Sequence, residues 1–427
     1  MIILLLILYD PTTLVYPPFS HTLGYHKGTL SHLRLATGKA IKFEGVGGIS
    51  AAKIDFLDDP KTLGDDDELT IFVTDFMRNS IFYNIGLRSL GMYKSPVIGD
   101  SSLWMPSDCE ITPEGVLWVV DRMRNRVAKF LFDGENLRFL EDFGHFGILQ
   151  GYFDDPRQIS VTKEEIYVTD YGNNRVQIFN HHGEFLKEVK GFDHPTGLAA
   201  VSSRDPWLRY PESFFVVIDY QKSRITKLSP DGKILSRLDK NVLNYPEVKF
   251  ESAAVDYYGL IWVTDSYNNC LHLFDRDLDY IAKYGRMGTG DKEFLYPTGI
   301  TIWRRYGQVF VVDSKSIQYF WMGVDAWIRG VEPGIFKPEE GVTISYYLTQ
   351  PARVIVKIYN SKEELVRKFN IGVIKDLGHN YFLWDTLDKE GKPVGEGKYK
   401  IELVFEPTYS SKGKFEKRIF TEVQCRQ

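Results

Sequence analysis

The chain repeats one strand–turn–strand unit along most of its length, and this repeat constrains the fold more than any other feature. Each copy ends an apolar run in Asp, and in most copies Asn follows four residues later; the copy at Ile166–Phe179 reads IYVTDYGNNRVQIF. Repeats that recur every 46–49 residues indicate stacked or radially arranged supersecondary units. Successive Asp residues are 46, 49, 49, 46 and 48 positions apart: Asp75, Asp121, Asp170, Asp219, Asp265 and Asp313.

Four short strands can be identified in each unit. The run after the turn alternates apolar and polar residues, as in Arg175–Phe179, which indicates one buried face. A Gly turn such as His182–Gly183 and another strand follow, and a strand that begins near a proline, as at Pro156, precedes the unit. Asp and Asn suit the tight turn because they bond to local backbone and tolerate left-handed conformations. Six such units predict an all-β, six-bladed β-propeller.

The turn and the linkers between units resemble the NHL-repeat family of six-bladed propellers. The resemblance rests on the Val-x-Asp-x-x-x-Asn-Arg turn and on two Gly-rich linkers, Gly144–Pro156 and Gly285–Pro297. It covers about residues 28 to 325 and is strongest in blades three and five. Blade six lacks an outer strand after Ser316–Trp321. We expect residues 29–35 to supply that strand and close the ring, which would remove two exposed sheet edges.

A different strand pattern begins after residue 337. Alternating runs such as Val342–Leu348 and Ala352–Tyr359 have the spacing of a β-sandwich. Pro351-Ala352, Trp384-Asp385, Asp388-x-x-Gly391 and Gly397-x-Tyr399 resemble the Ig-like domain of the flagellar hook-capping protein FlgD, a module that implies a spacer, attachment or assembly role. The expected organisation is an N-terminal segment 1–27, a propeller 28–325, a linker 326–337 and an Ig-like domain 338–427.

Charge and the N-terminus bear on partners and compartment. The net charge of −5 gives no global basic footprint, so no nucleic-acid partner is expected. The apolar run Met1–Tyr9 is too short to span a bilayer. It reads as the apolar region of a secretory signal, although no Lys or Arg precedes it, or else as a buried N-terminal strand. With the Ig-like resemblance, it predicts a secreted or cell-surface protein of bacterial type with no membrane span.

No catalytic constellation can be read from the sequence. The repeated Asp residues are explained as turn formers, and nucleophile, phosphate-loop and dinucleotide motifs are absent, so no catalytic residue, metal or cofactor is predicted. Amidating lyases similar to NHL propellers hold zinc with histidines, but His145, His194 and His272 occupy different positions in their blades. A lactonase-like calcium site that includes Asp108 and Glu251 is the main enzymatic alternative.

Two of the three cysteines are expected to differ in solvent exposure. Cys109 falls at an inner-strand position and is expected to be a small buried apolar residue. Cys270 replaces the Arg of the turn motif and is therefore expected to be more exposed.

The candidate binding residues are those that do not repeat. Alignment of the repeats places Asp108, Arg157 and Glu251 near the propeller axis, where an internal ion pair or a satisfied polar channel would also account for them. Arg122 and Arg124 fall in a turn. These residues predict a non-enzymatic binding protein whose propeller face takes a protein, peptide or glycan. A metal-dependent propeller enzyme and a self-assembling structural subunit are the alternatives.

Overall fold

The computed structural model describes residues 12–17, 27–29, 31, 45–58, 69–87, 89–239, 243 and 247–426. The chain forms two compact units, one spanning Phe19–Phe320 and the other combining Met1–Pro18 with Trp321–Gln427. Within the described residues, no helix is long and apolar enough to cross a membrane.

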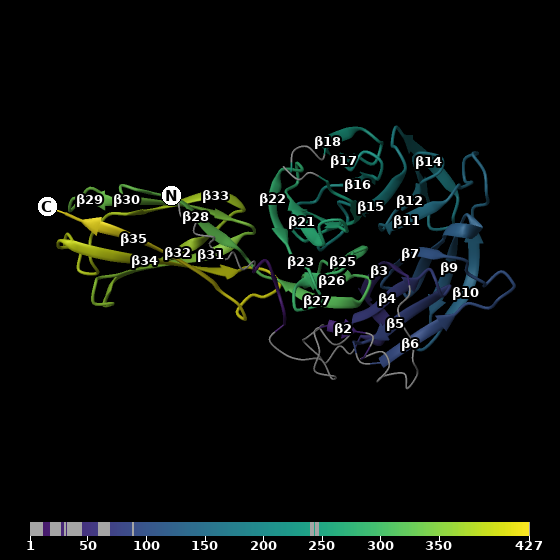
Figure 1. The fold of residues 1–427 in the computed structure, drawn as a ribbon, viewed down its shortest axis with the longest axis horizontal. Coiled ribbons are helices and arrows are strands. Elements are labelled where there is room, and N and C mark those ends of the chain that lie inside the picture. The colour runs from purple at the N-terminus through teal and green to yellow at the C-terminus, as the bar shows by residue number, and fades with distance from the viewer. Residues whose placement is uncertain are drawn as a thin grey trace. The chain divides into compact units, whose positions relative to one another are not determined.

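The larger unit is a β-propeller whose blades are antiparallel sheets arranged around an axis, with the first strand of each blade innermost (Figure 1). Five blades follow the chain in order. Their strands are β3 (Val46–Lys53), β4 (Leu69–Asp75), β5 (Ser80–Ile85) and β6 (Ser89–Lys94); β7 (Pro106–Ile111), β8 (Val116–Asp121), β9 (Arg126–Phe132) and β10 (Leu137–Phe143); β11 (Pro156–Val161), β12 (Ile166–Asp170), β13 (Arg175–Phe179) and β14 (Phe185–Lys190); β15 (Pro195–Val201), β16 (Phe214–Asp219), β17 (Arg224–Leu228) and β18 (Ile234–Asp239); β19 (Phe250–Val255), β20 (Ile261–Asp265), β21 (Cys270–Phe274) and β22 (Tyr280–Tyr284).

Blade six combines the two ends of the propeller unit. It contains β25 (Gly299–Trp303), β26 (Gln308–Val312) and β27 (Ser316–Met322), and β2 (Lys27–Thr29) pairs with β27 as an outer strand. Lys27, Gly28 and Thr29 lie opposite Gln318, Ile317 and Ser316. The innermost strands contact one another in sequence, and β25 contacts β3, so the ring closes. The rest of the closing strand expected at 29–35 lies outside the described residues, apart from Ser31.

The repeated Asp fastens each turn to the linker that enters its own blade. In blades two to five a backbone N–H of this linker donates to the Asp Oδ1 atom at 2.7–3.1 Å: Trp104 to Asp121, Asp154 to Asp170, Asp193 to Asp219 and Lys249 to Asp265. The carboxylates are buried. The prediction that these residues are turn formers is therefore confirmed, and the bond explains why the acid is needed at this position.

The repeated Asn fastens each turn to the next blade. Its side-chain oxygen accepts a backbone N–H from the following linker at 2.8–2.9 Å, as from Asp155 to Asn125, from His194 to Asn174 and from Tyr296 to Asn269. The Asn backbone is left-handed, with φ of 56° at Asn174. Asn meets both requirements, since it tolerates this conformation and its amide oxygen accepts a bond.

We expect Asn174→Gly to lower the free energy of unfolding by about 1–2 kcal/mol, because it keeps the left-handed backbone but leaves the His194 N–H without its acceptor. Asn174→Asp retains an oxygen acceptor and is expected to cost less than the Gly variant. Urea denaturation followed by circular dichroism measures both. Equal stability of the Gly variant and the wild-type protein would contradict the assigned role.

The smaller unit is a β-sandwich of two sheets. One has the order β28-β30-β33 and the other the order β29-β35-β34-β31-β32. Side chains alternate between buried and more exposed along β30, and Trp384 packs among the buried apolar side chains of both sheets. The strands are β28 (Ala326–Glu332), β29 (Ile335–Phe336), β30 (Val342–Leu348), β31 (Ala352–Tyr359), β32 (Leu365–Lys375), β33 (Gly378–Trp384), β34 (Gly397–Pro407) and β35 (Lys417–Cys425).

The prediction that residues 326–337 form a linker is wrong. β28 pairs with β30 from Ala326↔Leu348 to Glu332↔Thr343, and β29 pairs with β35. This segment therefore belongs to the sandwich. Thr12 and Thr13 belong to the same compact unit and donate to the carboxylate of Asp325, and β1 (Leu14–Val15) pairs with Met322 and Trp321 at the end of β27.

Candidate binding face and central cavity

The two ends of the propeller carry different groups. Because the strands are antiparallel, the Asp–Asn turns and the linkers that enter each inner strand lie at one end of the blades; Pro156, for example, lies opposite Asp170. We call this end the turn face. The loops after the inner strands form the opposite face, as shown by the pairing of Val161 with Ile166.

Two arginines from neighbouring blades converge on one carboxylate at the turn face. Arg122 donates Nε to Asp155 Oδ1 in a short bond and Nη2 to Oδ2 at 3.2 Å. Arg157 donates Nη2 and Nε to Asp155 Oδ2 at 2.6 and 3.1 Å. All three side chains are partly exposed. Partial burial lowers the pKa of Arg157, Asp155 raises it and Arg122 lowers it, with a net lowering.

This group continues along the turn face into blade four. The Arg157 guanidinium lies 4.1 Å from the centre of the Tyr171 ring, in cation–π contact. The Tyr171 ring packs edge-on against His194 with 4.7 Å between centroids, and His194 Nδ1 is 2.9 Å from Asp193 Oδ1. We define the Arg–Tyr patch as Arg122, Asp155, Arg157, Tyr171 and His194.

Large apolar side chains are exposed at the turns and linkers of the same face: Met77, Trp104, Met123, Tyr267 and Tyr296. Aromatic residues, Met and Arg are the types enriched in protein interfaces, and Trp, Tyr and Arg dominate their energetic hot spots. The turn face therefore has the composition of a protein-binding surface.

The structure brings together two of the five predicted binding residues and separates the other three. Arg122 and Arg157 meet on Asp155, whereas Arg124 donates to the Gly99 carbonyl at 3.2 Å. Glu251 is 3.2 Å from Lys249 Nζ and accepts from the Ser266 hydroxyl at 2.8 Å. Asp108 is buried between inner strands, where its Oδ2 accepts the Ile159 N–H at 3.0 Å. Neither Asp108 nor Glu251 belongs to a group of metal-ligating side chains in the described part of the chain.

A cavity of about 660 Å³ extends from the inner strands to the loops of the opposite face. Its size falls within the range of small-molecule sites. Polar inner-strand side chains around it fasten one blade to the next: Gln158 Oε1 accepts Leu198 N–H and Ser160 Oγ accepts Ala200 N–H, both at 2.9 Å. Asp108 makes the same kind of bond to Ile159. The bond from Ile159 thus gives Asp108 a structural role, because it joins two neighbouring inner strands.

Two carboxyl groups that line this cavity have raised pKa values. Burial raises the pKa of Asp108 to about 7, against bonds from backbone N–H groups that lower it. Burial and the charge of Asp108 raise the pKa of Glu110 to about 8, while Arg304 and a bond to Ser50 lower it. Glu110 was not among the sequence-predicted residues. The sequence offered one signal for Glu110: it lies two residues after Asp108 on β7, so both side chains point to the same side of the strand.

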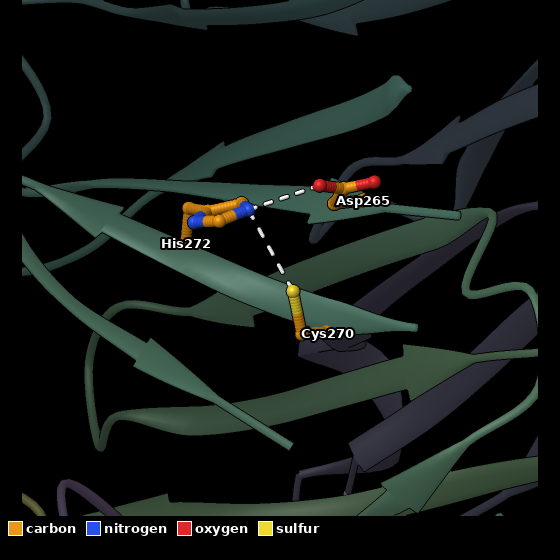
Figure 2. Close-up of side chains that lie close together, drawn as sticks. All are labelled: Asp265, Cys270 and His272. Carbon is orange, nitrogen blue, oxygen red and sulfur yellow. Dashed lines mark hydrogen bonds and ion pairs between the residues drawn. The ribbon is translucent and has the colours of Figure 1, made fainter. Parts of the chain in front are cut away.

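Blade five carries an unexpected group of polar side chains. Asp265, Cys270 and His272 point toward one another from β20 and β21 (Figure 2), and their ligand atoms all lie within 4.8 Å of each other. Cys270 is fully buried, so the expectation that it is more exposed is wrong. The motif Arg that it replaces is itself buried, as Arg175 shows, because it points inward to the Asp. Cys109 is buried as expected.

Comparison with known families supports both halves of the architecture. Residues 153–179 match the NHL repeat, residues 249–323 match a family described as 6-bladed beta-propeller, and residues 333–406 match the FlgD Ig-like domain. The chain is thus an all-β protein with a six-bladed propeller followed by an Ig-like sandwich.

Curated relatives match part of this chain. Protein brain tumor of Drosophila melanogaster is 26% identical over 34% of this chain and 14% of its own length. The E3 ubiquitin-protein ligase TRIM32 of Mus musculus is 29% identical over 44% of this chain and 22% of its own length. The B-box type zinc finger protein ncl-1 of Caenorhabditis elegans is 24% identical over 33% and 16%. The matched part is less than a quarter of each relative.

Solved structures with a related fold include enzymes. A virginiamycin B lyase of Staphylococcus aureus has a TM-score of 0.43 and 16% identity, covering 61% of this chain and 79% of the lyase. A gluconolactonase of Xanthomonas campestris has a TM-score of 0.47 and 14% identity, covering 73% and 96%. A protein of unknown function from Bacteroides thetaiotaomicron has a TM-score of 0.48 and 14% identity, covering 69% and 72%.

Proposed function

We propose that this is a non-enzymatic binding protein whose turn face binds an acidic segment of a partner protein. The observation that carries the proposal is the shared carboxylate of Asp155. It accepts bonds from two guanidinium groups, so Arg122, Asp155 and Arg157 together carry one excess positive charge. The bonds to Asp155 use Nε and Nη2 of each arginine, so the Nη1 groups can donate to an incoming acid.

The geometry of the patch favours a carboxylate ligand. Asp155 holds both guanidinium planes in place, and an ordered guanidinium can bind a carboxylate through two parallel bonds. Partial burial of Arg122 and Arg157 reduces the solvent screening that weakens fully exposed ion pairs. Tyr171 and the exposed aromatic residues of the same face supply apolar contact for the partner's neighbouring side chains.

A fluorescence-anisotropy titration with a short labelled peptide rich in Glu and containing one Tyr tests the proposal. We expect binding that weakens about tenfold or more in Arg122→Ala/Arg157→Ala, since each charge-assisted bond contributes about 1.5–3 kcal/mol. Arg204→Ala is the matched control, because Arg204 is an exposed arginine in a loop of the opposite face. Its affinity should be unchanged.

Three results would contradict this function. The first is equal binding of a peptide in which every Glu is replaced by Gln. The second is unchanged affinity in the double variant. The third is tighter binding of a single-stranded RNA of the same length than of the acidic peptide, which would assign the basic and aromatic side chains to nucleic acid instead.

A further inference from the structure

Blade five departs from blades two, three and four at two positions of one motif. In blades two, three and four the fifth residue after the repeated Asp is an Arg whose Nε donates to that Asp: Arg126 at 3.0 Å, Arg175 at 2.7 Å and Arg224 at 2.8 Å. In blade five this residue is Cys270. The seventh residue, Gln177 in blade three, is His272 in blade five. Both changes introduce a metal-ligating side chain beside the same buried carboxylate.

The strand register places the three side chains on one face of the blade. Asp265 ends β20 and lies directly opposite Cys270, the first residue of β21. His272 follows two residues later and therefore points to the same side as Cys270. Figure 2 shows the imidazole Nε2 facing both the carboxylate and the thiol. All three side chains are buried.

Two of the three distances between the ligand atoms are close to those around a tetrahedral ion, and the third is below 4.8 Å. His272 Nε2 is 3.1 Å from Asp265 Oδ2 and 3.6 Å from Cys270 Sγ. Zinc bonds of about 2.3 Å to sulfur and about 2.0–2.2 Å to nitrogen and oxygen place ligand atoms roughly 3.3–3.6 Å apart in a tetrahedron. Small side-chain adjustments would therefore admit an ion between these three atoms.

From this geometry we propose that blade five binds one Zn²⁺ ion through Asp265, Cys270 and His272, in place of the arginine that bonds the repeated Asp in blades two to four. A thiolate and a carboxylate together neutralise a divalent cation, so the buried site carries no net charge. The thiolate and imidazole select zinc over calcium or magnesium, which prefer oxygen ligands.

The surroundings of Asp265 already have the form of a supporting shell. Its Oδ1 accepts backbone N–H groups from Lys249, Tyr267 and Asn268 at 3.0–3.1 Å, and the Asn268 amide donates to Oδ2 at 2.7 Å. Bonds of this kind orient a metal-ligating carboxylate. The His272 ring packs near Phe250, which further limits its orientation. This inference concerns the interior of blade five and is independent of ligand binding at the turn face.

Metal analysis of untagged protein, purified from zinc-supplemented cells without chelator, tests the site. We expect about one zinc ion per chain in the wild-type protein and in Cys109→Ser, whose buried thiol lies in another blade. Cys270→Ser and His272→Ala should lose the zinc. Replacement of zinc by cobalt should give a thiolate-to-cobalt absorption band in the wild-type protein that Cys270→Ser lacks.

A second variant separates loss of metal from loss of fold. Cys270→Arg/His272→Gln reproduces the Arg175 and Gln177 pair of blade three beside Asp265, and we expect it to fold without zinc. A strong chelator should lower the melting temperature of the wild-type protein, and added zinc should restore it, whereas the double variant should not respond. Equal zinc content in wild-type protein and Cys270→Ser, or a wild-type melting temperature that is insensitive to chelator, would overturn the proposal.

Discussion

Arg175→Met is expected to lower the free energy of unfolding by about 3–5 kcal/mol, because it leaves a buried carboxylate without its ionic partner. Arg175 is 3% exposed and donates to Asp170 Oδ2 at 2.7 Å and to Glu188 at 2.8 Å. It also donates to the carbonyls of Ile148, Leu149 and Tyr152 at 2.8–3.1 Å. One side chain thus joins the turn, the outer strand and the entering linker of blade three.

The partner variant Asp170→Asn/Arg175→Met distinguishes loss of the ion pair from loss of packing. It removes both charges, so we expect it to be more stable than Arg175→Met alone. Burial raises the pKa of Asp170 even with Arg175 present, and without Arg175 the acid should be protonated at higher pH still. Urea denaturation at pH 7 measures all three proteins. If Arg175→Met lowers the free energy of unfolding by less than about 1 kcal/mol, the bonds of Arg175 contribute little to stability.

The second large effect is a loss of stability as pH rises, caused by the two acids of the central cavity. The folded-state pKa values of Asp108 and Glu110 are raised to about 7 and about 8 from ordinary values near 4. At pH values between the unfolded-state and folded-state pKa of each group, the folded protein binds more protons than the unfolded chain. The free energy of unfolding therefore decreases with increasing pH. Each group contributes about 1.4 kcal/mol per pH unit between its unfolded and folded pKa values, so from pH 5 to 8 we expect the pair to account for a decrease of about 6 kcal/mol.

Isosteric amides provide the test of this pH dependence. Asp108→Asn keeps an oxygen that can accept the Ile159 N–H, and Glu110→Gln keeps the shape of the longer side chain. Unfolding free energies measured from pH 5 to 8 should fall less steeply in each variant and least steeply in the double variant. Asp231→Asn, at an exposed turn, should follow the wild-type slope. A wild-type slope retained in the double variant would rule out these acids as its source.

Much of the fold could be predicted from the sequence because the repeat is local. The Asp turns and alternating strands of each blade reflect bonds between residues close in the chain, such as Asp154 N–H to Asp170. The prediction of a linker at residues 326–337 was wrong because β28 is recognised as a strand only through its pairing with β30. Secretion stays a prediction, since residues 1–11 lie outside the described part of the chain; fractionation of the producing cells would test it.

The candidate site was less predictable because it depends on contacts between blades. The sequence nominates Arg122 and Arg157 but gives no sign that Asp155, before a proline in a linker, joins them. Cys270 was misjudged for a related reason. The Arg of the motif looks like a surface residue until its buried bonds to Asp and to linker carbonyls are seen. The sequence signal for the polar group in blade five was a Cys five residues after the repeated Asp and a His seven residues after it.

Hydrogen–deuterium exchange of the protein with and without the acidic peptide tests whether the turn face is the binding surface, because it locates the bound peptide on the propeller. We expect slower exchange in the backbone amides of the segments that carry or adjoin the Arg–Tyr patch: residues 121–126, 154–158, 170–175 and 193–195. Slower exchange confined to residues 111–116, 161–166 and 202–213, at the mouth of the cavity on the opposite face, would contradict it.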